Sequence, residues 1–302
     1  MITLPGFGKM PIYDVVQFFF RGIRKSSLIS RANSLSFTFT LAMFPAILFL
    51  FTLIPYVPVE GLQQSIMSTL SEVLPEQVFS FLESTISEIV EKHNGGWLSL
   101  GFFMAFYFSN SGVIGIMKAF NRSAHAIETR SWWRMQLVSL GLQALLISLF
   151  ITAAALLILT PIFLNYVSSH NIITSDFAII LIQISKWIIL MILIFLTLSF
   201  IYYFAPAGKR VFRFISPGST MATILALVFI ALFNIYIDNF AQYNKLYGSI
   251  GTIIILMLYI NINAIALLIG FELNASIYDA QRRSAGGRMP GHPTSSGVPG
   301  DA

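Results

Sequence analysis

The chain contains six long apolar segments, and they restrict its fold more than any other feature. Each segment has roughly the 20 residues that a helix needs to cross a hydrocarbon core about 30 Å thick. The predicted spans are Ser36–Pro55, Trp97–Lys118, Leu137–Tyr166, Phe177–Phe204, Gly218–Ile237 and Tyr247–Asn274. A backbone in lipid must satisfy its own hydrogen bonds, and these segments are continuously apolar, not alternating. We therefore predict an all-α polytopic membrane protein with six transmembrane helices.

The composition agrees with a membrane environment. Of the 302 residues, 56% are hydrophobic and only 10% are charged, whereas soluble domains carry about 25% charged residues. Lipid must therefore be the solvent for most of the chain. The sequence has no cysteine, which excludes disulfides, thiolate metal sites and thiol nucleophiles.

The basic residues are distributed asymmetrically between the spans. Fifteen of the eighteen Lys and Arg residues lie in alternate gaps. They are Lys9, Arg21, Arg24, Lys25 and Arg31 before the first span, Lys118, Arg122, Arg130 and Arg134 after the second, Lys209, Arg210 and Arg213 after the fourth, and Arg282, Arg283 and Arg288 after the sixth. The positive-inside rule then places both termini in the cytoplasm. Topology also accounts for the net charge of +5, so we expect no nucleic-acid partner.

Three segments outside the spans complete the predicted organisation. Residues 1–30 form a cytoplasmic N-terminal segment, in which Tyr13–Ser27 is typical of an interfacial amphipathic helix. Residues 31–283 form the membrane domain, and its acidic insertion 59–96 is expected to hold one or two amphipathic helices on the outer face. Residues 284–302 are rich in Gly, Pro and Ser and are predicted to be disordered.

An ordered set of short motifs resembles a known family. The motifs are Arg31-Ala-Asn-Ser-Leu-Ser-Phe, Phe44-Pro45, Phe120-Asn121, Glu128-Thr-Arg130-Ser-Trp-Trp133-Arg134, Tyr203-Phe-Ala-Pro206, Ser216-Pro-Gly218, Tyr247-Gly-Ser-Ile-Gly251 and Gly270-Phe-Glu272-Leu-Asn274. Together, over residues 13–283, they resemble the YihY/BrkB family of bacterial inner-membrane proteins, once labelled ribonuclease BN. The resemblance implies six helices with both ends inside, a location in the bacterial cytoplasmic membrane, and transport connected with envelope lipids.

The basic loops supply the first candidate site. Arg31, Arg122, Arg130 and Arg134, together with Glu128, could form a cytoplasmic vestibule that holds an anionic lipid headgroup. Arginine suits phosphate because its planar fork donates two parallel hydrogen bonds. The alternative, which we favour for each residue alone, is that these charges only set topology and attract bulk anionic lipid.

Two further charged residues lie within or beside the spans. Lys186 is the one basic residue inside an apolar run, so it either serves a function in the membrane or, as we favour, snorkels to the outer interface beside Trp187. Glu272 is predicted at the cytoplasmic end of the sixth span, where it could carry a coupling proton or pair with an arginine. We favour pairing, because a helix C-terminus repels an unpaired anion.

Amides in the spans are the last candidates. Asn261 and Asn263 fall within the sixth span, and Ser109–Gly112 forms a comparable polar interruption of the second. Membrane amides usually form hydrogen bonds with a neighbouring helix, although they could also line a polar path.

These observations limit the function. The sequence has no phosphate-binding loop and no HExxH motif, and its histidines fall on loops of different sides, so we expect no enzyme activity, metal or cofactor. We predict a transporter or flippase-like protein for a lipid or amphipathic anion, with membrane lipids as partners and an undetermined oligomeric state. One alternative is a scaffold that recruits envelope machinery through the acidic outer loop. An intramembrane enzyme or ribonuclease has no nucleophile–base pair to support it.

Overall fold

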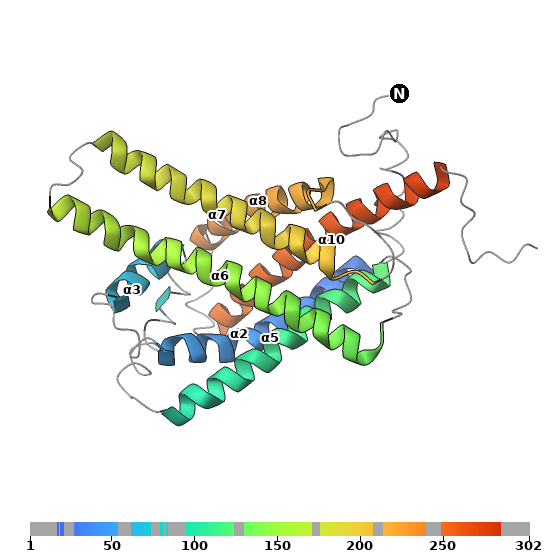
Figure 1. The fold of residues 1–302 in the computed structure, drawn as a ribbon, viewed down its shortest axis with the longest axis horizontal. Helices are drawn as coiled ribbons and strands as arrows, with labels where there is room; N and C mark the ends of the chain where they lie inside the picture. Colours follow the sequence, from blue (N-terminus) through green and yellow to red (C-terminus); the bar gives the residue numbers. More distant parts are fainter. Residues whose placement is uncertain are drawn as a thin grey trace, which may run out of the picture.

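The computed structural model describes residues 27–53, 62–73, 95–123, 130–170, 176–207, 214–239 and 249–284, with isolated positions at 17, 19, 20, 79, 80 and 83. Every secondary-structure element in these ranges is an α-helix (Figure 1). They are α2 (Leu28–Leu53), α3 (Leu62–Val73), α5 (Gly95–Ser123), α6 (Trp132–Ser169), α7 (Asp176–Phe204), α8 (Pro217–Asn239) and α10 (Ser249–Ser284). The prediction of an all-α protein is confirmed.

Four helices are long and apolar enough to cross a membrane. Their candidate spans are Ser99–Arg122, Trp132–Ser169, Phe177–Phe204 and Ile253–Gln281, and Pro217–Phe233 in α8 is a shorter apolar helix. The first predicted span, up to Leu53, lies in α2, which is 26 residues long. The structure therefore agrees with a polytopic membrane protein, whereas the total of six spans and their orientation stay predictions.

The surface of α6 and α7 is the clearest sign of a lipid environment. These two helices run side by side along one edge of the bundle (Figure 1). In the most apolar 18-residue stretch of α6, no residue is buried. In the corresponding stretch of α7, only 6% of the residues are buried. Large side chains such as Phe150, Ile151 and Ile184 are more than half exposed. Apolar surface on this scale is stable only against hydrocarbon or another protein.

The buried core lies towards one end of the bundle. Helix α10 is central and contacts α2, α8 and α5, while α2 also packs along α5. Leu35 of α2, Met117 and Phe120 of α5, and Leu268 and Phe271 of α10 are almost completely buried together. This is the end where α5 and α7 finish and where α2, α6 and α8 begin, and it is the end that the positive-inside rule predicts to face the cytoplasm.

Two helix ends differ from the predicted spans. Helix α2 begins at Leu28, so Arg31 is inside the first turn of a helix rather than in the gap before it. Helix α10 continues to Ser284, so the prediction that Glu272 occupies a helix C-terminus is wrong. The extension persists because Ala275, Ile277 and Ala280 are buried against the bundle, which compensates for its polar outer face.

The segments outside the spans are described only in part. Helix α3 falls within the predicted insertion 59–96 and contacts α6. Most of the remainder of that insertion, most of the predicted interfacial helix Tyr13–Ser27 and the tail 285–302 lie outside the described residues. The predicted domain boundaries therefore stay predictions.

Candidate functional site

A buried ion pair joins two helices at the core end. Arg31 of α2 donates from Nη2 to Oε1 of Glu272 in α10 across 2.5 Å, and the two side chains are only 2% and 3% exposed. Arg31 also donates from Nη1 to the carbonyl oxygen of Ala119 in α5, at 2.9 Å. One guanidinium therefore connects α2, α5 and α10. The favoured prediction that Glu272 pairs with an arginine is confirmed.

The surrounding helix ends explain part of this electrostatic arrangement. The cation of Arg31 lies in the first turn of α2, where the positive end of the helix dipole opposes it. It is offset by Glu272 and by the C-terminal end of α5, because α5 ends at Ser123, one turn after Ala119. A buried charge of either sign alone would be strongly destabilising, so the two charges are mutually dependent.

Aromatic rings pack in the same buried region as the pair. Phe120 of α5 and Phe271 of α10 stack with their ring centroids 4.0 Å apart and their planes 3° from parallel. Tyr202 of α7 lies beside Phe120, at 5.7 Å between centroids, and its hydroxyl donates to the carbonyl of Leu267 at 2.8 Å. These rings are almost completely buried, so the neighbourhood of the pair excludes water.

Two side chains satisfy the backbone at the end of α7. The guanidinium of Arg130, just before α6, donates to the carbonyl of Pro206. Asn121 of α5 accepts a hydrogen bond from the backbone N–H of Ala207 through Oδ1, at 2.7 Å. The two bonded backbone groups belong to Pro206 and Ala207, which follow the end of α7 at Phe204. Backbone groups at a helix end have no partner within the helix. Arg130 also complements the negative end of the α7 dipole.

The start of α8 is capped from within and from α10. Ser216 is the N-cap, since its hydroxyl accepts from the N–H of Ser219 and the Ser219 hydroxyl accepts from the N–H of Ser216, both at 3.1 Å. Asn274 of α10 accepts from the N–H of Gly218 at 2.9 Å and donates to the Ser216 hydroxyl at 2.9 Å. The first turn of α8 is therefore fixed to α10.

Glycine allows this close approach. A Cβ at Gly270 would lie 2.5 Å from the carbonyl oxygen of Gly218 and 2.6 Å from the Cβ of Ala222. Contacts this short do not occur between real side chains and backbone, so α8 and α10 can touch only because both positions lack a side chain.

We call this whole constellation the junction. It consists of Arg31, Phe120, Asn121, Arg130, Tyr202, Pro206, Ser216, Gly218, Gly270, Glu272 and Asn274. Most of the motifs that carry the family resemblance contribute to it. The candidate site residues from the sequence included Arg31, Arg130 and Glu272 but missed Asn121 and Asn274. The signals for these two were their places in the motifs Phe120-Asn121 and Gly270–Asn274 and an amide close to the end of an apolar run.

The other predicted site residues lie outside the junction. Arg122 and Arg134 are exposed at the end of α5 and the start of α6, on the same side of the bundle. Lys186 of α7 is half-buried, with Nζ 5.1 Å from the ring centroid of the neighbouring Trp187, an arrangement compatible with snorkelling. Glu128 lies outside the described residues.

The two predicted amides of the sixth span behave differently from each other. Asn261 of α10 donates to Oδ1 of Asn33 in α2 at 2.8 Å, and so bonds across to a neighbouring helix. Asn263 donates to the carbonyl of Tyr259 in its own helix at 2.9 Å. Neither one belongs to the junction.

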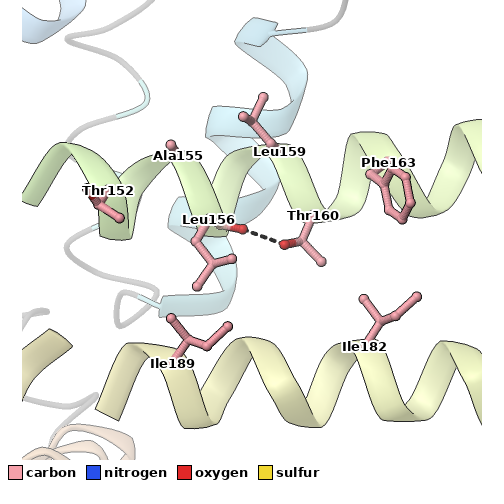
Figure 2. Close-up of a pocket in the computed structure, with 8 residues that line it drawn as sticks. All are labelled: Thr152, Ala155, Leu156, Leu159, Thr160, Phe163, Ile182 and Ile189. Atoms are coloured by element: carbon pink, nitrogen blue, oxygen red, sulfur yellow. Dashed lines mark hydrogen bonds between the residues drawn. The ribbon is translucent and has the colours of Figure 1, made fainter. Parts of the chain in front are cut away.

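A second feature of interest is an apolar groove between α6 and α7. Figure 2 shows Leu156, Thr160 and Phe163 of α6 facing Ile182 and Ile189 of α7. The groove has a volume of about 450 Å³. The Thr160 hydroxyl donates to the carbonyl of Leu156 in its own helix, at 2.5 Å (Figure 2). The one hydroxyl donor of Thr160 is therefore satisfied within α6. A space lined in this way suits a hydrocarbon chain and not a headgroup.

Comparisons with known proteins agree with the membrane architecture. The chain matches the family described as virulence factor BrkB over residues 19–292. YfkH of Bacillus subtilis, named as ribonuclease-like, is 28% identical over 84% of this chain and 91% of its own. A UPF0761 membrane protein of Idiomarina loihiensis is 24% identical over 74% of this chain and 74% of its own. A UPF0761 membrane protein of Psychromonas ingrahamii is 23% identical over 88% of this chain and 88% of its own. No solved structure matches the chain.

Proposed function

The chain belongs to the virulence factor BrkB family and is a multi-pass membrane protein of bacterial type, and from this premise we propose that it moves a lipid or another amphipathic anion across the cytoplasmic membrane. The observation that carries the proposal is the buried Arg31–Glu272 pair, which connects α2, α5 and α10 at one end of the bundle.

An anionic headgroup could exchange with Glu272. A phosphate group offers Arg31 two oxygens in the geometry that a carboxylate offers, so it can take the place of Glu272 without leaving the cation buried alone. Replacing one anion by another avoids the cost of about 3–5 kcal/mol that follows from breaking a buried pair. An anion would therefore open the contact between α2 and α10, whereas a neutral headgroup would not.

Two other features support an amphipathic substrate. Arg122 and Arg134 are exposed on the same side as the junction, where they would concentrate anionic headgroups at the membrane surface by about 1 kcal/mol per charge. The apolar groove between α6 and α7 would accept the acyl chain. The groove begins at Thr152, twenty residues after Trp132 and so about 30 Å along α6 from the junction end, so it would hold the chain of a lipid towards the other face of the membrane.

Lipid exchange in reconstituted vesicles tests the proposal. The protein would be incorporated into vesicles containing fluorescent phosphatidylglycerol, phosphatidic acid, phosphatidylethanolamine or phosphatidylcholine, and the labelled lipid accessible to an impermeant quencher would be followed in time. We expect the protein to accelerate exchange of the anionic lipids most. Equal kinetics with and without protein for all four headgroups would refute transport of lipids.

Variants at Arg31, Arg122 and Arg134 identify the arginines that act. Arg31→Lys retains a charge for Glu272 but loses the planar fork, so the preference for phosphate should fall while folding, measured by thermal unfolding, is retained. The double variant Arg122→Gln/Arg134→Gln should raise the fraction of anionic lipid needed for half-maximal exchange, and the matched double lysine variant should not. If deletion of residues 59–96 abolished function in cells while exchange in vesicles stayed normal, the scaffold alternative would be favoured instead.

A further inference from the structure

Lys186 lies inside the apolar run of α7 and has no protein anion beside it. Among the described residues, no carboxylate forms an ion pair with Lys186. Helix α6 contains no acidic residue, and the one acid of α7 is Asp176, ten residues earlier and so about 15 Å away along the helix axis. A positive charge at a membrane that has no counter-ion in the protein attracts an anion from the lipid.

Lys186 also lies on the side of α7 that faces the apolar groove. Ile182 and Ile189 line the groove from α7, and Lys186 is four residues after the first and three residues before the second. Residues at these spacings share one stripe of a helix. Lys186 is half-buried, and its Nζ lies 5.1 Å from the ring centroid of Trp187, which is 53% exposed. The stem of Lys186 therefore lies at the level of the groove, and its ammonium lies beside an exposed ring at the groove's edge.

The groove is suited to a hydrocarbon chain. Six of its eight lining residues are apolar, and the other two are threonines. The Thr152 hydroxyl donates to the carbonyl of Ser148 at 2.8 Å, and the Thr160 hydroxyl is satisfied by the carbonyl of Leu156. Both hydroxyl donors are thus used within α6. The volume of about 450 Å³ is in the range of ligand pockets, about 300–1,000 Å³, so the groove can hold an acyl chain.

The position of Lys186 along α7 places this side chain near the outer leaflet. Lys186 is 18 residues before Phe204, the last residue of α7, which corresponds to about 27 Å along the helix axis. Phe204 belongs to the end of the bundle that is predicted to face the cytoplasm. The hydrocarbon core is about 30 Å thick, so Lys186 is near its outer boundary. A lysine at that depth extends its ammonium to the headgroups while its stem stays in the apolar region.

We propose that Lys186 and the groove bind an anionic phospholipid of the outer leaflet, with the phosphate at the ammonium and one acyl chain in the groove. Charge complementarity selects this occupant, because the phosphate of a zwitterionic headgroup already has a cation of its own. Lysine is a compact charge on a flexible stem, so it can follow a phosphate at the edge of the groove. The site rests on the proposed function for its role, as the outer end of a path whose inner end is the junction, whereas lipid binding itself requires no transport.

Quenching of Trp187 fluorescence by brominated lipids measures this binding at equilibrium. Replacing Trp97, Trp132 and Trp133 by Phe leaves Trp187 as the one tryptophan of the chain, next to the ammonium of Lys186. The full chain would be reconstituted in phosphatidylcholine with increasing fractions of brominated phosphatidylglycerol or brominated phosphatidylcholine. We expect phosphatidylglycerol to bind beside Trp187 about fivefold more tightly, which corresponds to about 1 kcal/mol for one basic residue. A ratio of one would overturn the proposal, and transport would still be decided by the exchange assay alone.

Variants of Lys186 separate the site from the charge of the whole protein. Lys186→Gln should lower the ratio at Trp187 to about one, whereas Lys186→Arg retains the charge and should retain the ratio. A matched chain that keeps Trp133 instead of Trp187 reports lipids at the start of α6, and its ratio should be the same with and without Lys186→Gln. If Lys186→Gln left the ratio at Trp187 unchanged, or lowered it equally at Trp133, Lys186 would not be the headgroup contact.

Filling the groove tests the acyl chain separately from the headgroup. Ala155 lines the groove, so Ala155→Phe should weaken the binding of phosphatidylglycerol at Trp187. Ala144→Phe adds the same ring at an exposed position of α6 that does not line the groove, and it should leave binding unchanged. Equal binding by the two variants would remove the groove from the site. Tighter binding of dibromostearate than of brominated phosphatidylglycerol would assign the site to a free fatty acid and overturn the choice of a phospholipid.

Discussion

Glu272→Gln isolates the charge of the buried pair. The amide has nearly the same shape and retains an oxygen that can accept from Arg31 Nη2, so the change removes little except the negative charge. In the folded protein the side chain of Arg31 is 2% exposed, and its cation would lose the charge of the Glu272 carboxylate. In the unfolded state Arg31 can snorkel to the interface from its place near a helix end. The penalty therefore falls on the folded state.

The size of the effect follows from the burial of both partners. Removing one member of a buried ion pair costs about 3–5 kcal/mol. The hydrogen bond from Arg31 to Ala119 survives in this variant, and the glutamine still accepts one from Arg31, so we expect the lower end, about 3 kcal/mol. This corresponds to a decrease of roughly 100-fold in the ratio of folded to unfolded protein.

A double variant distinguishes charge from packing. In Arg31→Met/Glu272→Met both charges are gone and the space is refilled with flexible apolar side chains, a replacement that is often neutral or stabilising. The double variant should therefore be more stable than Glu272→Gln by about 2 kcal/mol or more. Arg134→Gln, which removes an exposed arginine from the same side, is the control and should change stability by less than about 0.5 kcal/mol.

The assay is reversible unfolding in mixed micelles of lipid and denaturing detergent, followed by the loss of helical circular dichroism and repeated at two wavelengths. The reasoning is refuted if Glu272→Gln is within about 1 kcal/mol of the natural protein, because a charge pair buried from water cannot be worth so little. It is also refuted if the double methionine variant loses as much stability as Arg31→Met and Glu272→Met lose in sum, since the charges would then act independently.

Three further predictions concern packing, capping and orientation. Gly270→Ala should destabilise the protein by about 1–3 kcal/mol, because the new methyl group has no room beside α8, whereas Gly141→Ala, with nothing within 4 Å, should be neutral or stabilising by up to about 1 kcal/mol; thermal unfolding in detergent measures both. Asn274→Ala leaves buried groups at the start of α8 without a partner and should cost about 1–3 kcal/mol, with faster amide hydrogen exchange confined to the first turn of that helix; unchanged exchange there would contradict the capping role. Because the chain has no cysteine, the variants Arg134→Cys and Ser169→Cys report orientation, and an impermeant maleimide added to intact cells should label only Ser169→Cys; the reverse pattern would invert the predicted topology.

The helices were predictable because their signal is local. A run of apolar residues long enough for the membrane identifies a helix without any knowledge of its neighbours. The ends were less predictable, since hydropathy falls at the first charged residue whether or not the helix continues. Helix α2 extends past Arg31 because that charge is paired, and α10 extends past Asn274 because one of its faces is buried. Both reasons depend on contacts distant in sequence.

The candidate site was predictable only in its ingredients. The sequence gives Glu272 several basic residues as possible partners, and selecting Arg31 requires the packing of α2 along α5 and α10. Asn121 and Asn274 were harder still, because an amide near the end of a span is ordinary at a membrane interface. Their importance arises from the helix termini that they reach, at Ala207 and Gly218, and those termini belong to other segments of the chain.

The junction also determines how an anion could control the bundle. Its polar contacts fix the ends of α5, α7 and α8 to Arg31, Arg130 and Asn274, whereas the groove between α6 and α7 is lined by apolar side chains that give no directional restraint. Opening the junction without a replacement anion costs about 3 kcal/mol or more for the broken ion pair, and under the proposed function a phosphate at Arg31 would offset that cost. If the pair is the gate, an anionic lipid should therefore cross faster than a zwitterionic lipid of the same chains by up to roughly 100-fold, and this ratio should collapse in the double methionine variant. A preference for anionic lipids that persisted in that variant would place the gate elsewhere and reduce the pair to a structural clamp.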